Sequence, residues 1–177
     1  MTDSSSTAVH EVVDASVIED YKLNKKIELI GVSEFDQLAL SFQKPTIVVF
    51  WASWCGSCFK EIPTIKEYTK ARDIDLVFVS FDKQNKRQEE QVVKKMKALG
   101  IDKTFQLNGE GGVFDFTNIK KLVAFLEERG IAESDINGLP INLVYKEGKL
   151  ISIFDSLDYQ AFVYQAFDEL IQGASLE

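Results

Sequence analysis

The stretch WASWCGSC, residues 51–58, carries the strongest indication of the fold in this chain. It ends a continuous run of β-branched and aromatic residues that begins at position 46, which is typical of a strand buried on both faces. After it, residues 58–70 place apolar side chains at near-helical spacing. We therefore predict that two cysteines lie where a buried strand passes into a helix.

Beyond this helix, a second apolar run at residues 75–81 predicts a neighbouring strand, because a crossover helix joins adjacent parallel strands. Residues 86–99 predict the next crossover helix. The other predicted elements are a strand at 27–30, a short helix capped by Ser33, a short strand at 105–107, a helix at 118–129 ended by Gly130, a hairpin of 141–145 with 150–154, and an amphipathic helix at 159–170. Together they predict one α/β domain with a central mixed β-sheet flanked by helices on both faces.

Composition limits the classes of partner. The 177 residues carry a formal net charge of -8, which disfavours nucleic acid, since binding to its backbone depends on Lys and Arg. No stretch approaches the roughly 18 apolar residues of a membrane span. Residues 1–6 are polar and acidic, unlike the start of a secretory signal. We expect no nucleic-acid partner and no membrane contact by the chain as given.

We divide the chain into three parts. Residues 1–20 are rich in Ser, Asp and Glu with little periodicity, and we expect a flexible tail there. Residues 21–175 carry the predicted domain, and residues 176–177 resemble a cloning remnant. Such a remnant is compatible with an anchor having been removed from the other end.

The two cysteines suit local redox chemistry. Cys55 lies at the predicted helix N-terminus, where unpaired N–H groups and the helix dipole stabilise a thiolate, so we predict that it is the nucleophile. Cys58 lies in the first helical turn and would resolve the mixed disulfide. Half of a zinc site is an alternative, but four ligands are needed and His10 is the only histidine. Two inert buried cysteines are another alternative. We expect no metal and no cofactor.

Residues 51–63, WASWCGSCFKEIP, resemble the active-site stretch of thioredoxin-like proteins, and most closely that of the TlpA/ResA group. The resemblance runs from Lys26 to the C-terminus and includes Gly-Leu-Pro at 138–140. It implies a thioredoxin fold, with a cis peptide bond before Pro140 packed beside the disulfide. From the residues alone, Pro140 would be a trans proline that starts a strand.

The resemblance also implies roles for the residues around the cysteines. The backbone of Leu139, next to Pro140, would pair with an extended substrate segment, to which Trp54 would offer an apolar contact. Glu61 matches a glutamate that the TlpA/ResA group holds near the disulfide. Partial burial there would favour its protonated form and let it relay a proton as a third catalytic residue. The alternative for Glu61 is an ordinary exposed helix carboxylate.

The chain departs from thioredoxin itself at several positions. Val49 stands where thioredoxin has a buried acid, and Ser57 replaces the usual proline. The missing acid removes one proton acceptor for Cys58, which makes Glu61 the better candidate for that work. Residues 114–138 exceed the usual connection before the cis-proline, and we expect them to influence partner choice.

We predict a thiol-disulfide oxidoreductase that exchanges disulfides with protein substrates. The Gly-Ser pair between the cysteines lacks the histidine of strongly oxidising relatives, which favours action as a reductant. Alternatives are a non-catalytic adaptor of the same fold and a peroxiredoxin-like peroxide reductase. The expected partners are protein disulfides or dithiols and an upstream redox partner, and we expect a monomer. The resemblance implies a location outside the cytoplasm, and a cytoplasmic location is the alternative.

Overall fold

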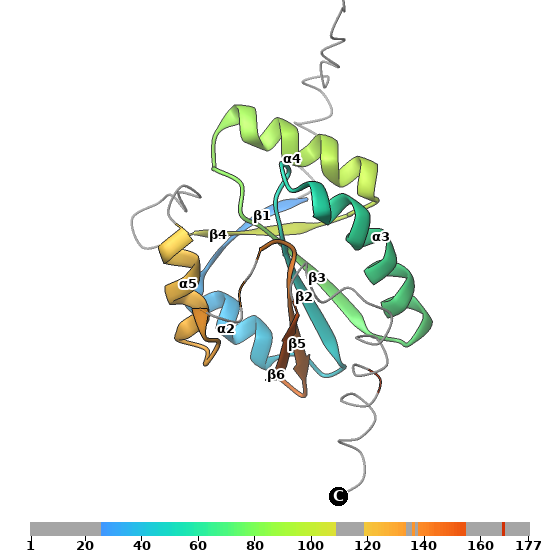
Figure 1. Cartoon of the computed structure of the whole chain (residues 1–177), viewed down its shortest axis with the longest axis vertical. Coiled ribbons are helices and arrows are strands. Elements are labelled where there is room, and N and C mark those ends of the chain that lie inside the picture. The colour runs from blue at the N-terminus through green and yellow to red at the C-terminus, as the bar shows by residue number, and fades with distance from the viewer. Residues whose placement is uncertain (1–25, 109–118, 134–135, 137, 155–167, 169–177) are drawn as a thin grey trace, which may run out of the picture.

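The chain forms a mixed β-sheet covered by helices (Figure 1). The computed structural model describes residues 26–108, 119–133, 136, 138–154 and 168. Its elements in chain order are β1 (Ile27–Gly31), α2 (Val32–Leu40), β2 (Thr46–Trp51), α3 (Gly56–Ala71), β3 (Asp75–Ser80), α4 (Lys86–Leu99), β4 (Thr104–Asn108), α5 (Ile119–Glu127), β5 (Ile141–Lys146) and β6 (Lys149–Phe154).

The strands lie in the order β1-β4-β3-β2-β5-β6. Strands β1, β4, β3 and β2 run parallel to one another, whereas β5 is antiparallel to both β2 and β6. The two continuous apolar runs of the sequence form β2 and β3, which pair at the centre with Val49 opposite Phe78. The prediction of neighbouring central strands in a mixed sheet is confirmed.

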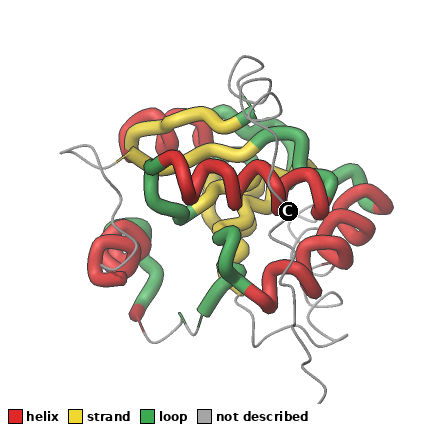
Figure 2. The backbone as a smooth tube through the Cα atoms, turned by 90° about the horizontal axis from the view of Figure 1, so that it is seen from above, coloured by secondary structure: helices red, strands yellow, loops and turns green. Residues whose placement is uncertain are grey.

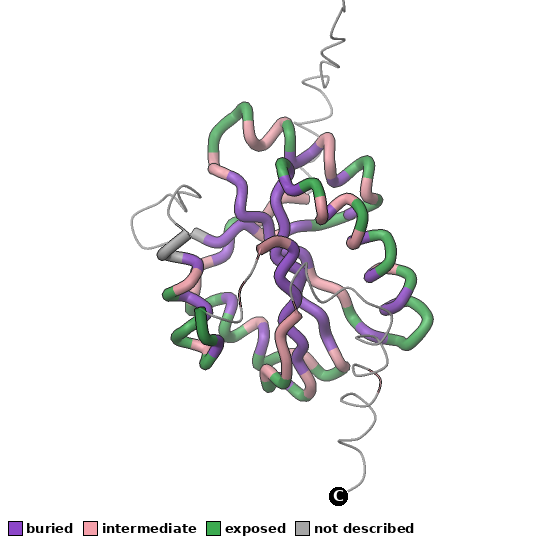
Figure 3. Tube along the Cα trace, viewed as in Figure 1, coloured by how far each residue is buried: buried purple, intermediate pink, exposed green. Residues whose placement is uncertain are grey.

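The sheet separates two apolar layers. In β2, Ile47, Val49 and Trp51 pack on the side of α3 and α4, whereas Val48 and Phe50 pack on the side of α2 and α5. Figure 2 shows the strands lying between helices, and Figure 3 shows the buried residues gathered along the central strands. Every residue of β2 is buried, as expected of a strand covered on both faces. The predicted helices on both faces are confirmed.

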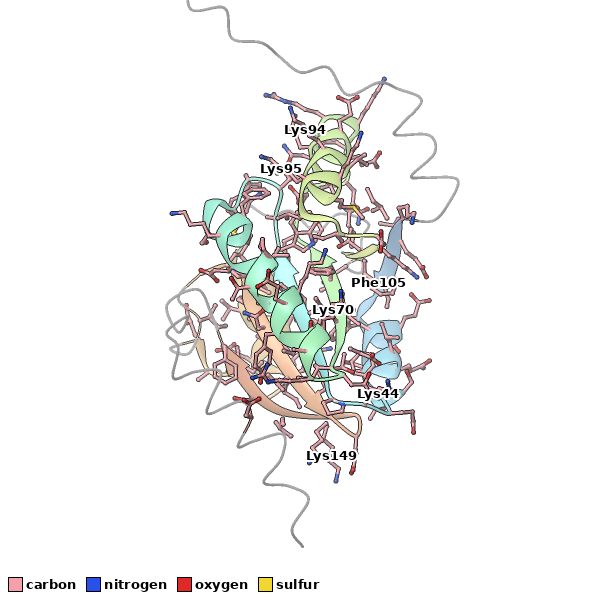
Figure 4. All side chains as sticks on the ribbon, turned by 90° about the vertical axis from the view of Figure 1, so that its right-hand side faces the viewer. Lys44, Lys70, Lys94, Lys95, Phe105 and Lys149 are labelled. Atoms are coloured by element: carbon pink, nitrogen blue, oxygen red, sulfur yellow. A yellow bond between two sulfur atoms is a disulfide. The ribbon has the colours of Figure 1, made fainter. Side chains whose placement is uncertain are left out.

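Helices α3 and α4 also contact each other along the outside of their layer. The Lys95 Nζ of α4 lies 4.2 Å from the centroid of the Phe59 ring of α3. The Lys66 Nζ of α3 donates a hydrogen bond to the Leu99 carbonyl at 2.9 Å. Figure 4 shows Lys95 on α4 and Lys70 on α3 on the side of the molecule that faces the viewer. These contacts join α4 to the helix that carries the cysteines.

The N-terminus of α2 differs from the prediction. Gly31, and not Ser33, is the N-cap residue, and the helix begins at Val32. The Gly31 N–H donates to a carboxylate oxygen of Glu34 at 2.8 Å, which satisfies one of the groups that a helix start leaves unpaired. Ser33 therefore lies inside the first turn.

Two of the predicted chain reversals contain residues with positive φ. Gly130 follows the end of α5 with φ of 80° and marks the helix end predicted there. In the β5–β6 hairpin, Glu147 and Gly148 have φ of 50° and 73°, as tight turns of this kind require. The predicted hairpin is confirmed.

The predicted C-terminal helix at 159–170 lies outside the described residues except for Asp168. That carboxylate accepts hydrogen bonds from the Arg72 Nε at 2.6 Å and from the Tyr68 hydroxyl at 2.8 Å. The Arg72 guanidinium holds the pKa of Asp168 below its usual value. Among the residues that the structure describes, no helix combines the length and the apolar character needed to cross a membrane.

The hairpin turn offers a test of this packing. A Cβ added at Gly148 would lie 2.7 Å from the Leu40 carbonyl oxygen, in addition to the strain of a φ of 73°. At Gly130 the φ is 80°, but nothing lies within 4 Å of an added Cβ. We expect Gly130→Ala to cost about 1–2 kcal/mol of unfolding free energy from backbone strain alone, and Gly148→Ala clearly more. Urea denaturation measures both, and equal losses would contradict the close approach to Leu40.

Candidate active site

Cys55 and Cys58 form a disulfide at the start of α3, with an Sγ–Sγ distance of 2.06 Å. Cys55 is the N-cap residue of the helix, and its sulfur accepts a hydrogen bond from the Cys58 N–H at 3.1 Å. Cys55 is 4% exposed and Cys58 is fully buried. The predicted position of the pair, between a buried strand and a helix, is confirmed.

Backbone hydrogen bonds hold the turn that leads from β2 into α3. The Cys55 N–H donates to the Ala52 carbonyl at 3.0 Å, and the Phe81 N–H donates to the Trp51 carbonyl at 2.9 Å. The chain thus turns immediately beyond β2 and places Cys55 where the first N–H groups of α3 lack helical partners. That location stabilises a negative charge on the sulfur once the disulfide is reduced.

Leu139 and Pro140, which directly precede β5, form the second segment of the site. The Leu139–Pro140 peptide bond is cis, as the family resemblance implied, and Pro140 is buried. Leu139 packs against the apolar cluster that contains both cysteines. Its carbonyl accepts a hydrogen bond from the Ser57 hydroxyl at 2.7 Å, which joins two segments that are 82 residues apart in the sequence. The expectation that this segment lies beside the disulfide is confirmed.

The other predicted site residues lie close to the cysteines in the chain. Trp54 directly precedes Cys55 and is 56% exposed, so it presents apolar surface beside the disulfide. Glu61 lies one helical turn after Cys58 and is partly buried, with its Oε2 atom shielded from solvent. Val49 is fully buried in the cluster that includes both cysteines. An apolar side chain therefore occupies the position at which thioredoxin has an acid.

Sequence reasoning missed Asp82, a buried carboxylate just beyond β3. It is 2% exposed and accepts hydrogen bonds from the Ser53 N–H at 2.9 Å and from the Ser53 and Ser80 hydroxyls at 2.5 and 2.7 Å. Because a carboxylate has room for several donors, one side chain holds the ends of β2 and β3 together. The sequence did offer a signal for Asp82. It is an acid that directly follows the apolar run at residues 75–81, and that run was predicted to pair with the strand leading to the cysteines.

The fold and this pair of cysteines define a thioredoxin-fold protein with a CxxC dithiol. A family model described as Thioredoxin matches residues 26–128, which is more than half of the chain. The chain belongs to the thioredoxin family.

Individual relatives match over shorter stretches or at lower identity. The thioredoxin of Mycobacterium tuberculosis is 34% identical over 82 residues, which cover 46% of this chain and 55% of the relative. The chain thus spans about half the length of that curated relative. A putative thioredoxin from Neisseria meningitidis has a TM-score of 0.49 at 19% identity and covers 79% of this chain and 82% of its own. A thiol:disulfide interchange protein from Bacteroides sp. has a TM-score of 0.49 at 18% identity and covers 80% of each chain.

The Asp82 contacts predict a large effect on stability. Asp82→Ala leaves the buried Ser53 N–H and two hydroxyls without their acceptor, and we expect a loss of about 3 kcal/mol in unfolding free energy. Asp102 is exposed, and Asp102→Ala serves as the control, with a change within about 0.5 kcal/mol. Urea denaturation of the oxidised proteins gives both values. A loss at Asp82 no larger than that at Asp102 would show that the carboxylate does not hold the two strand ends.

Proposed function

We propose that this chain is a thiol-disulfide oxidoreductase that reduces disulfides in protein substrates. The observation that carries the proposal is the Cys55–Cys58 pair at the N-terminus of α3, with the Cys58 N–H donating to the Cys55 sulfur. A helix start favours the thiolate form, which is the form that attacks disulfides. Membership of the thioredoxin family supports the same activity.

The exchange takes place in two steps. The Cys55 thiolate attacks one sulfur of the substrate disulfide, so that a mixed disulfide forms and the other substrate sulfur leaves as a thiolate. Cys58 then loses its proton and attacks the Cys55 sulfur, which forms the Cys55–Cys58 disulfide and expels the second substrate thiolate. The dithiol gives up two electrons, and the substrate thiolates take up protons from Cys58 and solvent.

Burial supports the proposed order of these steps. Cys58 is fully buried, whereas Cys55 retains some exposure and lies next to the exposed Trp54. A folded substrate therefore meets Cys55 first, and Cys58 acts within the protein. Glu61 is the group that we propose to take the Cys58 proton, because it lies one helical turn further on and its carboxylate is partly shielded from solvent.

The proposed docking groove lies between Trp54 and the segment at Leu139 and Pro140. We propose that an extended substrate strand pairs with the Leu139 backbone while Trp54 covers its apolar side chains. An upstream dithiol partner would return two electrons to the disulfide. The resemblance of residues 51–63 to the TlpA/ResA group supports a location outside the cytoplasm, and we propose that the protein acts there as a monomer.

Single cysteine variants test the mechanism. Cys55→Ser should abolish reduction of a quenched fluorescent peptide that contains one disulfide, because no nucleophile remains at the helix start. Cys58→Ser should instead accumulate a mixed disulfide with the peptide, which mass spectrometry detects as an added peptide mass. If Cys55→Ser reduces the peptide as fast as the native chain does, the thiols are incidental and the fold serves as a non-catalytic adaptor.

The direction of electron flow follows from the reduction potential. We expect a midpoint nearer to the value of about -270 mV found for thioredoxin than to the value of about -120 mV found for a strong oxidant such as DsbA. Equilibration in glutathione or dithiothreitol buffers, followed by alkylation and mass spectrometry, gives the fraction of Cys55–Cys58 disulfide at each potential. A midpoint near the oxidising value would reverse the proposed direction.

A further inference from the structure

The Ser57 hydroxyl lies between two groups that the proposed exchange uses. Its oxygen is 2.7 Å from the Leu139 carbonyl oxygen, to which it donates, and 3.4 Å from the Cys55 sulfur. A serine hydroxyl carries one hydrogen and can donate to one acceptor at a time. The Leu139 carbonyl and the Cys55 sulfur therefore compete for the same donor.

The charge on the Cys55 sulfur decides this competition. In the disulfide the sulfur is uncharged and is a weak acceptor, so the carbonyl takes the hydrogen, as the shorter distance shows. When two electrons reduce the disulfide, Cys55 becomes a thiolate. A hydrogen bond to a charged acceptor is roughly twice as strong as one between neutral groups. Rotation of the hydroxyl about its own bond is enough to redirect the hydrogen.

We propose that Ser57 is a catalytic residue that couples the charge of Cys55 to the availability of the Leu139 carbonyl. In the reduced protein the hydroxyl donates to the thiolate, and the Leu139 carbonyl is released to accept a hydrogen bond from a substrate backbone N–H. This inference rests on the proposed function, because it concerns the docking strand and the nucleophile of the same reaction.

The coupling acts in opposite directions before and after the reaction. The Cys55 thiolate attacks the substrate disulfide and becomes a neutral sulfur in the mixed disulfide, and it stays neutral after Cys58 has displaced the substrate. The Ser57 hydroxyl then returns to the Leu139 carbonyl and competes with the substrate backbone. The reduced form is thus prepared for docking and the oxidised form for release.

Other groups around the Cys55 sulfur do not provide the same link between its charge and the Leu139 carbonyl. The Cys58 N–H already donates to the Cys55 sulfur in the oxidised form, so formation of the thiolate requires no change of partner from it. Glu61 lies on the same helix and Asp82 lies beyond β3, and an ionised carboxylate is an acceptor rather than a donor. Asp82 accepts from Ser53 and Ser80.

Two measurements on the whole chain test the proposal. The first is the carbonyl-carbon chemical shift of Leu139, which NMR reads in the oxidised and in the reduced protein. We expect it to change on reduction of the native chain and of Ser57→Thr, which keeps the hydroxyl. In Ser57→Ala it should stay near the reduced native value in both states. Asp102→Ala, at the exposed position outside the site, is the control and should respond like the native chain.

The second measurement is the rate of Cys55 alkylation by iodoacetamide as a function of pH. Loss of one hydrogen bond to the thiolate should move the midpoint of this profile upward by about one pH unit in Ser57→Ala, whereas Ser57→Thr should restore it. An unchanged midpoint in Ser57→Ala, or a Leu139 shift that responds to reduction equally in Ser57→Ala and the native chain, would overturn the proposal. Peptide reduction by the native chain is scored separately, so that failure of the coupling is distinguished from failure of the oxidoreductase activity.

Discussion

Burial of β2 on both faces fixes the register of the sheet and the place of the cysteines. Its side chains alternate between two helical layers, so the strand cannot shift by one residue without exchanging the partners of every side chain. Its pairing with β3 on one edge and β5 on the other fixes its place in the sheet. The position of Cys55, four residues after Trp51, follows from this.

The site itself is held by polar contacts that connect distant segments. Asp82 joins the end of β3 to Ser53, and the Ser57 hydroxyl joins the start of α3 to Leu139. Such bonds contribute modest net stability when they are made, but a buried group that loses its partner is costly. They therefore favour one arrangement of the segments that carry Ser53, Asp82 and Leu139 over other arrangements that would bury a similar apolar area. The cysteines and the segment at Leu139 and Pro140 are brought together in this way.

The parts of the fold that sequence patterns predicted are those whose signal is local. Continuous apolar runs gave β2 and β3, and glycine at a tight turn gave the β5–β6 hairpin. The prediction for β4 was two residues short, because the strand carries buried polar residues that break the apolar pattern. One of them, Thr104, accepts a hydrogen bond from the Trp51 indole at 3.1 Å. Asp82 and the Ser57–Leu139 contact were not predicted for a related reason. Each joins residues that are distant in the sequence and meet only because the ends of neighbouring strands lie side by side in the folded sheet.

The two cysteines differ because one lies outside the helix and the other inside it. Both cysteines belong to the apolar cluster that contains Val49, but the Cys55 sulfur, at the N-cap position, accepts a hydrogen bond from the Cys58 N–H, whereas the Cys58 side chain is fully buried. Charge is therefore favoured on the first sulfur and disfavoured on the second. Because position 49 carries a valine and not an acid, its side chain cannot accept the proton of Cys58. In the proposed mechanism the resolving step sends its proton along α3 or to solvent, and this would give the partly buried Glu61 carboxylate a use that an exposed carboxylate at this position would lack.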